Sequence, residues 1–345
     1  MASAVSARKN VSGPTIPPAV LKAMLAIFLF IIVPVALSWI GGGYLFQVAT
    51  TTLIFIILAS SLNLVTGTAG LLSLGHAGFY GIGAYAAALL STRLGLSFLA
   101  TLPLAGVAAG AVGVLVALPT MRLVSIYFAV ATLGIGEMIY VILLNWTGFT
   151  HGPMGIRGIP PIDLLGWQPG TPLFDYLVVA AVTALSLWAM SRLMHSYYGN
   201  ALRAVREDDQ CADAMGLNVV RLKIEAFGVS CFFAGIAGAL FCHTAGFISP
   251  DQFRFAESIN ILAMVVVGGL GSLPGAVIGA ALLIILPEAL RSFGDFRMIA
   301  IGSIMFLSIL LQPKGLLGEA SALDLLRRQF GQGWSGNFAT RVGWR

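Results

Sequence analysis

Apolar runs long enough to cross a bilayer recur along this chain, and they constrain its fold more than any other feature. A spanning helix needs about 20 apolar residues at a rise of about 1.5 Å each. Only 10% of the 345 residues are charged, against about 25% in ordinary soluble domains. The sequence therefore predicts an all-α, polytopic membrane protein with about ten transmembrane segments. The candidate runs are 20–40, 44–66, 70–91, 96–118, 126–144, 174–194, 222–246, 257–272, 274–291 and 297–312.

Two of these runs contain residues that interrupt a helix. The sequences are GLLSLGHAGFYG, which begins at Gly70, and GGLGSLPG, which begins at Gly268. Their glycine, serine, histidine and proline residues predict broken or re-entrant segments near 70–85 and 266–276. Both contain Gly-Leu-x-Ser-Leu, and transporters are often built from two related halves with interrupted helices. An internal repeat and a chance similarity in glycine-rich sequence remain equal alternatives.

A charged stretch from Tyr198 to Asn218 interrupts the apolar pattern. Its spacing predicts one helix over 201–215, with Asn200 as the N-cap and Gly216 as the stop signal. Such a helix is too short and too charged to span a membrane. Apolar residues mixed with both charge signs favour docking into a partner's groove over binding anionic lipid. The plain alternative is a solvated surface loop.

Lysine and arginine in short loops indicate the cytoplasmic side. With ten crossings, most basic clusters fall on one side, which predicts cytoplasmic termini and a cytoplasmic charged stretch. The chain then divides into a tail at 1–19, a transmembrane domain at 20–312 and a tail at 313–345. The net charge of +5 reflects this bias, so no nucleic-acid partner is expected. The basic residues on that side are Arg8, Lys9, Lys22, Arg122, Arg192, Arg203, Arg206, Arg221, Lys223, Lys314, Arg327, Arg328, Arg341 and Arg345.

Several motifs occur in an order that is similar to one transporter family. The charged stretch contains RAVREDDQCADAMGLN, which resembles the coupling-helix motif of bacterial ABC importer permeases of the branched-chain amino acid (LivM-type) family. The supporting motifs are SLNLVTGTAGLLSLGHAGFYGIGAYAAALL at 61–90, IYFAVATLGIGEMI at 126–139, NWTGFTHGPMGI at 145–156, VVVGGLGSLPGAVIGA at 265–280 and LQPKGLLG at 311–318. The resemblance covers roughly 61–318.

This resemblance implies a permease in the bacterial inner membrane. Similar proteins pair with a second, LivH-like permease subunit, receive substrate from an external binding protein and are driven by two cytoplasmic ATPase subunits. The segment 199–217 would be the coupling helix that sits in the ATPase. The chain has no G-x-x-x-x-G-K-[ST] loop, so ATP would be used by the partner subunits and no cofactor is expected here. The residues expected in coupling are Arg203, Arg206, Glu207, Asp208, Asp213 and Gly216.

The first predicted break offers polar groups beside apolar surface, as a path for amino acids requires. A histidine at such a place is more often a packing residue than a ligand. Glu137 lies deep in the fifth run, where an acidic group needs a partner or a water-filled cavity. The candidates for the translocation path are Asn63, Thr66, Ser73, His76, Tyr80 and Glu137.

Other functions would need other residues. A permease of the same type for urea or short amides remains an alternative, because the binding protein largely sets specificity in such systems. An ion-coupled secondary transporter would need several intramembrane acidic groups. A membrane enzyme would need convergent catalytic or metal-binding residues, and the four histidines show no such spacing. No catalytic residue and no metal site are expected.

Overall fold

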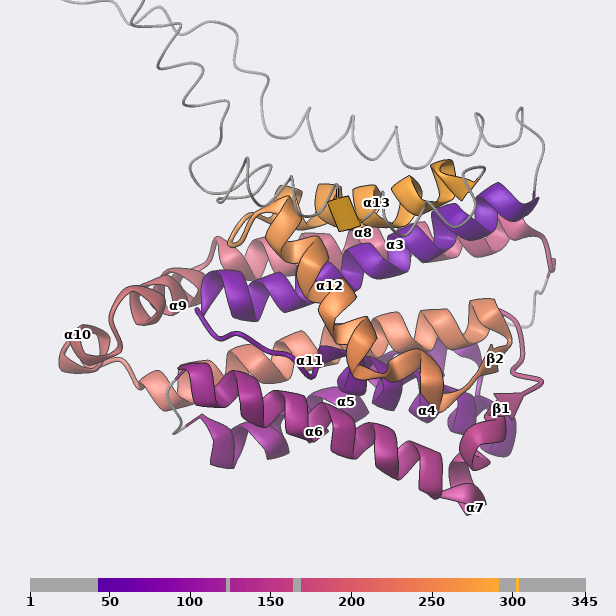
Figure 1. The fold of residues 1–345 in the computed structure, drawn as a ribbon, viewed down its shortest axis with the longest axis horizontal. Helices are drawn as coiled ribbons and strands as arrows, with labels where there is room; N and C mark the ends of the chain where they lie inside the picture. The colour runs from indigo at the N-terminus through magenta and orange to yellow at the C-terminus, as the bar shows by residue number, and fades with distance from the viewer. Residues whose placement is uncertain (1–42, 122–124, 164–168, 292–301, 304–345) are drawn as a thin grey trace, which may run out of the picture.

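The chain forms a bundle of helices that lie along roughly one direction (Figure 1). The computed structural model describes residues 43–121, 125–163, 169–291 and 302–303. The predicted run 20–40 lies outside the described residues, as do nearly all of 297–312 and the tails 1–19 and 313–345. The elements are α3 (Gly43–Asn63), η2 (Leu64–Thr68), α4 (His76–Leu94), α5 (Phe98–Thr120), α6 (Ser125–Asn145), α7 (Thr147–Thr150), η3 (Gly152–Met154), β1 (Ile156–Arg157), α8 (Pro172–Met194), α9 (Tyr197–Glu207), α10 (Asp209–Ala214), α11 (Val219–Ala245), β2 (Phe247–Ile248), η4 (Pro250–Phe253), α12 (Phe255–Gly268) and α13 (Leu273–Ala289).

Five of the described helices are long and apolar enough to cross a membrane. They are Gly43–Thr68, Phe98–Thr120, Ile126–Asn145, Pro172–Met194 and Val219–Ala245. The helices α4, α12 and α13 are shorter or less apolar, with 19, 14 and 17 residues. The structure therefore confirms a mostly helical membrane protein, whereas the count of ten segments stays a prediction.

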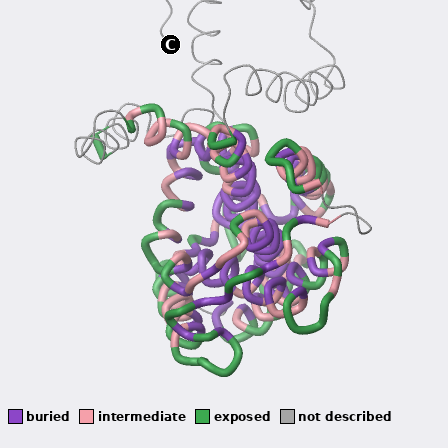
Figure 2. The backbone as a smooth tube through the Cα atoms, turned by 90° about the vertical axis from the view of Figure 1, so that its right-hand side faces the viewer, coloured by how far each residue is buried: buried purple, intermediate pink, exposed green. Residues whose placement is uncertain are grey.

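Burial divides the spanning helices into inner and outer ones. In α3 with η2 and in α11, 83% and 72% of the apolar window is buried, against 28–39% in α5, α6 and α8. Figure 2 shows the buried residues running through the middle of the molecule. Outer helices expose large apolar side chains such as Leu115, Ile126 and Leu185. A surface of this kind suits lipid or a partner helix, because neither demands polar groups.

The inner helices α4 and α11 cross at glycines. A Cβ at Gly83 would lie 2.3 Å from the Cα of Gly235, and a Cβ at Gly238 would lie 2.3 Å from the carbonyl oxygen of Tyr80. Real side chains do not come so close to a backbone, so the two helices meet backbone to backbone. Small residues at such crossings are typical of membrane helix packing, where close van der Waals contact holds helices together.

The connections gather at the two ends of the bundle. At one end α9 and α10 extend beyond the other helices, near the junction of α12 and α13 (Figure 1). At the other end β1 pairs antiparallel with β2, with Ile156 opposite Ile248 and Arg157 opposite Phe247. The charged stretch and the β1–β2 pair thus lie at opposite ends of the bundle (Figure 1). Which end faces the cytoplasm stays a prediction.

Candidate coupling segment and helix breaks

The charged stretch forms two short helices, so the prediction of a single helix over 201–215 is wrong. Asp208 separates α9 from α10 with an extended backbone at φ −157° and ψ 112°. Its carboxylate accepts hydrogen bonds from the backbone N–H groups of Gln210 at 2.8 Å and Cys211 at 3.0 Å. An aspartate that caps the following turn competes with helix continuation. We call residues 197–216 the coupling segment.

The predicted N-cap Asn200 is also wrong, because α9 begins four residues earlier. Ser196 is the N-cap, and its hydroxyl accepts from the N–H of Gly199 at 3.4 Å. Gly199 lies inside α9, where a Cβ would come within 2.2 Å of the Met194 carbonyl oxygen. The glycine therefore permits a sharp turn between α8 and α9. Asn200 instead accepts a hydrogen bond from Arg203 at 2.9 Å.

One face of the coupling segment packs on the bundle. Leu202, Val205 and Ala212 are buried, while Asp209 and Met215 are exposed. The segment thus has an apolar underside and a charged outer side.

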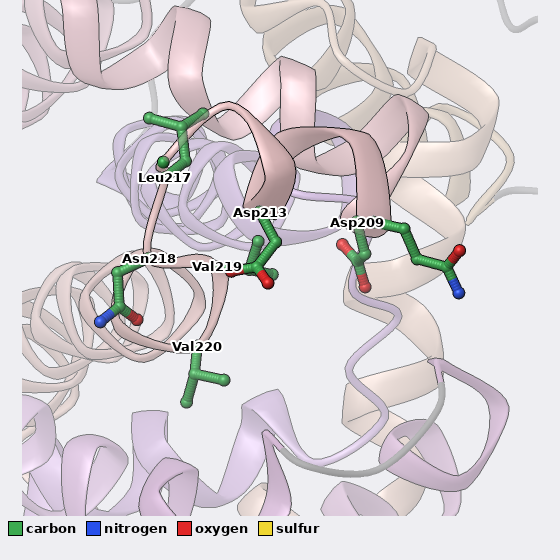
Figure 3. Close-up of a pocket in the computed structure, with 8 residues that line it drawn as sticks. Asp209, Asp213, Leu217, Asn218, Val219 and Val220 are labelled. Carbon is green, nitrogen blue, oxygen red and sulfur yellow. The ribbon is translucent and has the colours of Figure 1, made fainter.

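A surface hollow of about 520 Å³ opens between α10 and the start of α11 (Figure 3). Asp209 and Asp213 lie on one side of it, and Leu217, Val219 and Val220 supply apolar surface. The Asp209 carboxylate forms an ion pair with Lys223 of α11. Gly216 has φ +86°, a conformation that favours glycine, and so lets the chain turn from α10 into α11. Asn218 then caps α11 by accepting from the N–H of Arg221 at 3.0 Å.

The exposed thiol of Cys211 is a natural reporter for this segment, because Cys231 and Cys242, the other two cysteines, are buried. The hydrogen bond to the Asp208 carboxylate raises the pKa of the Cys211 thiol, and the caps on α10 lower the pKa of Asp208. We expect Asp208→Asn, which can still cap, to shift the pH profile of thiol alkylation to lower pH. Rates measured from pH 7 to 10 check this, with Glu207→Gln as the control; an unchanged profile would contradict the contact.

The coupling segment contacts the first helix break directly. Nη1 of Arg206 donates to the carbonyl oxygen of Gly67 at 2.6 Å. Gly70, at φ +72°, approaches the same side chain, because a Cβ there would lie 3.0 Å from Cγ of Arg206. Arg206 was expected to act across the ATPase interface, and the structure shows that its guanidinium also binds its own chain. Arg203, Glu207 and Asp213 lie at the surface of the same segment.

The first break is shorter than predicted. The chain leaves helical geometry after the π-helical turn η2, and α4 begins at His76, so the non-helical part is 69–75 rather than 70–85. The second break lies between α12 and α13 at 269–272, inside the predicted 266–276. Both Gly-Leu-x-Ser-Leu motifs therefore fall on breaks. This agreement leaves the internal repeat a prediction.

Asn63 joins the two breaks. Its Oδ1 accepts from the N–H of Gly271 at 2.8 Å, and its Nδ2 donates to the carbonyl oxygen of Ser272 at 3.0 Å. Gly67 lies against the same place, with the position of a Cβ only 2.2 Å from the Gly271 nitrogen. Asn63 thus satisfies the N–H of Gly271, which the broken helix leaves without a backbone partner, and adds a second donor to the carbonyl of Ser272, which also accepts from the N–H of Ala276. It was predicted to line the translocation path, and its observed contacts are structural.

The other candidates for the translocation path differ in their burial and in their contacts. His76 is buried and its Nε2 lies 2.8 Å from Oγ of Ser61, which is the packing arrangement that histidines most often adopt. Tyr80 is buried against Phe241 and Phe253. Thr66 and Ser73 are buried, and their hydroxyls have no partner among the described residues. Glu137 is half-buried on α6.

None of these path candidates lines the two hollows described here. The second hollow, of about 310 Å³, lies between α3, α8 and α11 near the end that carries β1 and β2. It combines apolar and polar groups from three separate helices, and the sequence carries no signal that brings them together. Its lining includes Phe46, Gln47, Thr50, Thr51, Asp175, Phe241 and Thr244. Within the described ranges, no three His, Cys, Asp or Glu side chains are placed to hold a metal ion.

Comparison with known proteins now decides the family. A family model described as "Branched-chain amino acid transport system / permease component" matches residues 44–311. The chain belongs to this permease family. The matched range includes both breaks and the whole coupling segment.

Two kinds of curated relatives resemble this permease. The high-affinity branched-chain amino acid transport system permease proteins LivM of Salmonella typhimurium and Escherichia coli are each 40% identical over 337 residues, which cover 90% of this chain and 79% of theirs. LivH of Escherichia coli, from the same kind of system, is 27% identical over 292 residues, or 77% of this chain and 91% of LivH. No solved structure matches the permease. As a member of this family, the protein is a transport permease.

Proposed function

We propose that this permease is one half of the transmembrane path of an ABC importer for branched-chain amino acids and that the coupling segment receives movement from cytoplasmic ATPase subunits. The observation that carries the proposal is the coupling segment itself. It extends beyond the bundle (Figure 1), exposes charges of both signs and ends at the hollow beside α10. A hollow with carboxylates and apolar surface suits a protein partner better than anionic lipid.

The second half of the path is a homologous permease. Relatives named LivM and LivH are both similar to this chain, which supports a pair of related subunits rather than a lone channel. The exposed apolar faces of the outer helices provide surface for such a partner. An external binding protein would deliver substrate at the end that carries β1 and β2. In this arrangement the protein lies in the inner membrane, with the coupling segment and both termini in the cytoplasm.

The substrate class follows from the relatives' names, and a permease for urea or short amides is the alternative of the same type. Neither hollow distinguishes a branched aliphatic side chain from an amide. The chain holds no cofactor of its own in this proposal, because the ATPase subunits bind and hydrolyse the ATP. The binding protein selects the substrate.

Reconstitution tests the proposal. The permease, its LivH-like partner and the ATPase subunits are placed in liposomes with the binding protein, and uptake of labelled leucine and urea is compared. We expect leucine uptake that requires ATP and both ATPase subunits, and its loss when residues 203–213 are deleted. Uptake driven by an ion gradient without ATPase subunits would refute the proposal, and uptake of urea alone would correct the substrate.

A further inference from the structure

Three segments that are distant in sequence meet at one point of the bundle. The coupling segment contributes Arg206, the turn η2 with the first break that follows it contributes Gly67 and Gly70, and the second break contributes Gly271. The contacts form a continuous series, because Arg206 binds the carbonyl of Gly67, and Gly67 packs on the backbone of Gly271. Asn63, one turn before Gly67, holds the second break by two further hydrogen bonds.

The carbonyl that Arg206 binds belongs to the π-helical turn at the end of α3. A π-turn has i→i+5 hydrogen bonds in place of the i→i+4 bonds of an α-helix and is frequently found at functional sites. Arginine supplies a charge-assisted hydrogen bond, which is stronger than a neutral one. The side chain also covers Gly70, where a Cβ would approach Cγ of Arg206. The end of α3 is therefore fixed to the coupling segment by a specific contact and not merely by apolar packing.

Buried polar groups around the first break point to a second arrangement of the same segment. The hydroxyls of Ser60, Thr66, Thr68 and Ser73 are buried and have no hydrogen-bond partner among the described residues. Buried hydroxyls without a partner cost free energy, so a cluster of them requires an explanation. A conformation in which the break shifts would offer these hydroxyls new partners, whereas the inner helices α4 and α11, packed backbone to backbone, leave little room to deform.

We propose that Arg206 is a positioning residue that ties the π-helical end of α3 to the coupling segment, so that movement of the segment reaches the two helix breaks before the rest of the bundle. This inference rests on the proposed function for its source of movement. The receiving element is the pair of breaks, joined by Asn63, and the transmitting contact is the hydrogen bond from Arg206 to Gly67. The breaks then move together, since a shift of Gly67 displaces Gly271.

The test uses Arg206→Gln and Arg206→Lys in the complete transporter, with Arg221→Gln as the control. Arg221 is an exposed arginine near the coupling segment that pairs with Glu225 on its own helix. Leucine uptake and ATP hydrolysis are measured together in the same liposomes. Arg206→Gln is expected to lower the uptake per ATP by about ten-fold or more, which is the effect of losing one charge-assisted hydrogen bond. Arg206→Lys keeps a charged donor, so its uptake per ATP should lie between those of Arg206→Gln and the wild type. Arg221→Gln should match the wild type.

A second measurement detects the contact without transport. Hydrogen exchange on the purified permease should be faster at residues 65–72 and 269–272 in Arg206→Gln, and unchanged there in Arg221→Gln. The proposal is overturned if an Arg206 variant that assembles with the ATPase subunits has the uptake per ATP of the wild type. It is also overturned if neither variant assembles with the ATPase subunits. If the wild-type complex fails to transport while the exchange difference is present, the proposed function fails and the positioning contact stands. If the wild-type complex transports with ATP but hydrogen exchange is unchanged in Arg206→Gln, the proposed function stands and the positioning contact fails.

Discussion

Gly83→Ala should destabilise the permease by about 3 kcal/mol, the upper part of the range for overpacking a well-packed core. The added methyl would lie 2.3 Å from the Cα of Gly235, which is backbone and cannot rotate away. The helices α4 and α11 would have to separate along their whole contact. We expect a lower melting temperature in detergent and less protein in the membrane, measured by thermal unfolding and by quantitative blotting.

Gly134→Ala is the matched control on α6. A Cβ at Gly134 meets nothing within 4 Å, so the same chemical change adds no clash. Alanine is favoured over glycine inside a helix by about 1 kcal/mol, and this variant should be as stable as the wild type or slightly more so. Equal melting temperatures for the two variants would contradict the close approach at Gly83.

Asn63→Ala is expected to have a similarly large effect for a different reason. The substitution leaves the N–H of Gly271 unpaired inside the bundle, whereas the carbonyl of Ser272 keeps the N–H of Ala276 as a donor. An unsatisfied buried group costs about 1–3 kcal/mol, so a loss of about that size is expected. Thermal unfolding measures the total, and hydrogen exchange at 269–272 locates it at the second break.

Asn145→Ala controls for the loss of an asparagine. The side chain of Asn145 bonds to the carbonyl of Val141 one turn earlier on an exposed part of α6, so its removal should hardly change stability. The comparison also separates the two roles considered for Asn63. A normal melting temperature of Asn63→Ala together with an altered KM for substrate would support a role of Asn63 in the translocation path and would contradict its structural role.

The sequence could predict the helical membrane class, five of the spans and the position of the two breaks, because each depends on local composition. A spanning run is visible in its apolar length, and a break is visible in glycine beside serine or proline. The predicted break near 70–85 is longer than the observed one because His76 and Gly78 are unfavourable for a helix by local preference. Tertiary contacts override that preference, since the backbone N–H of Ala77 at the start of α4 donates to the hydroxyl of Ser258 at 3.0 Å.

The candidate site was harder to predict because its contacts join distant residues. Polar groups near a break suggested a path for substrate, yet Asn63 and His76 bind other parts of the bundle. The sequence shows that a buried asparagine needs partners but not that they lie in 269–272. The division of the coupling segment at Asp208 has only a weak local signal, an aspartate followed by a second acidic residue. The same two residues are equally compatible with the interior of one charged helix.

The bridge made by Asn63 has a consequence for how the protein is made. Its partners lie 208 and 209 residues further along the chain. At about 5–20 residues per second, the ribosome needs roughly 10–40 s to synthesise that interval. During this time the first break enters the membrane before its partners exist, and its polar groups must be sheltered by water or by the insertion machinery. The docking of α12 and α13 onto α3 is therefore a late step, and variants at Asn63 should accumulate as chains that are inserted but remain sensitive to protease at the second break.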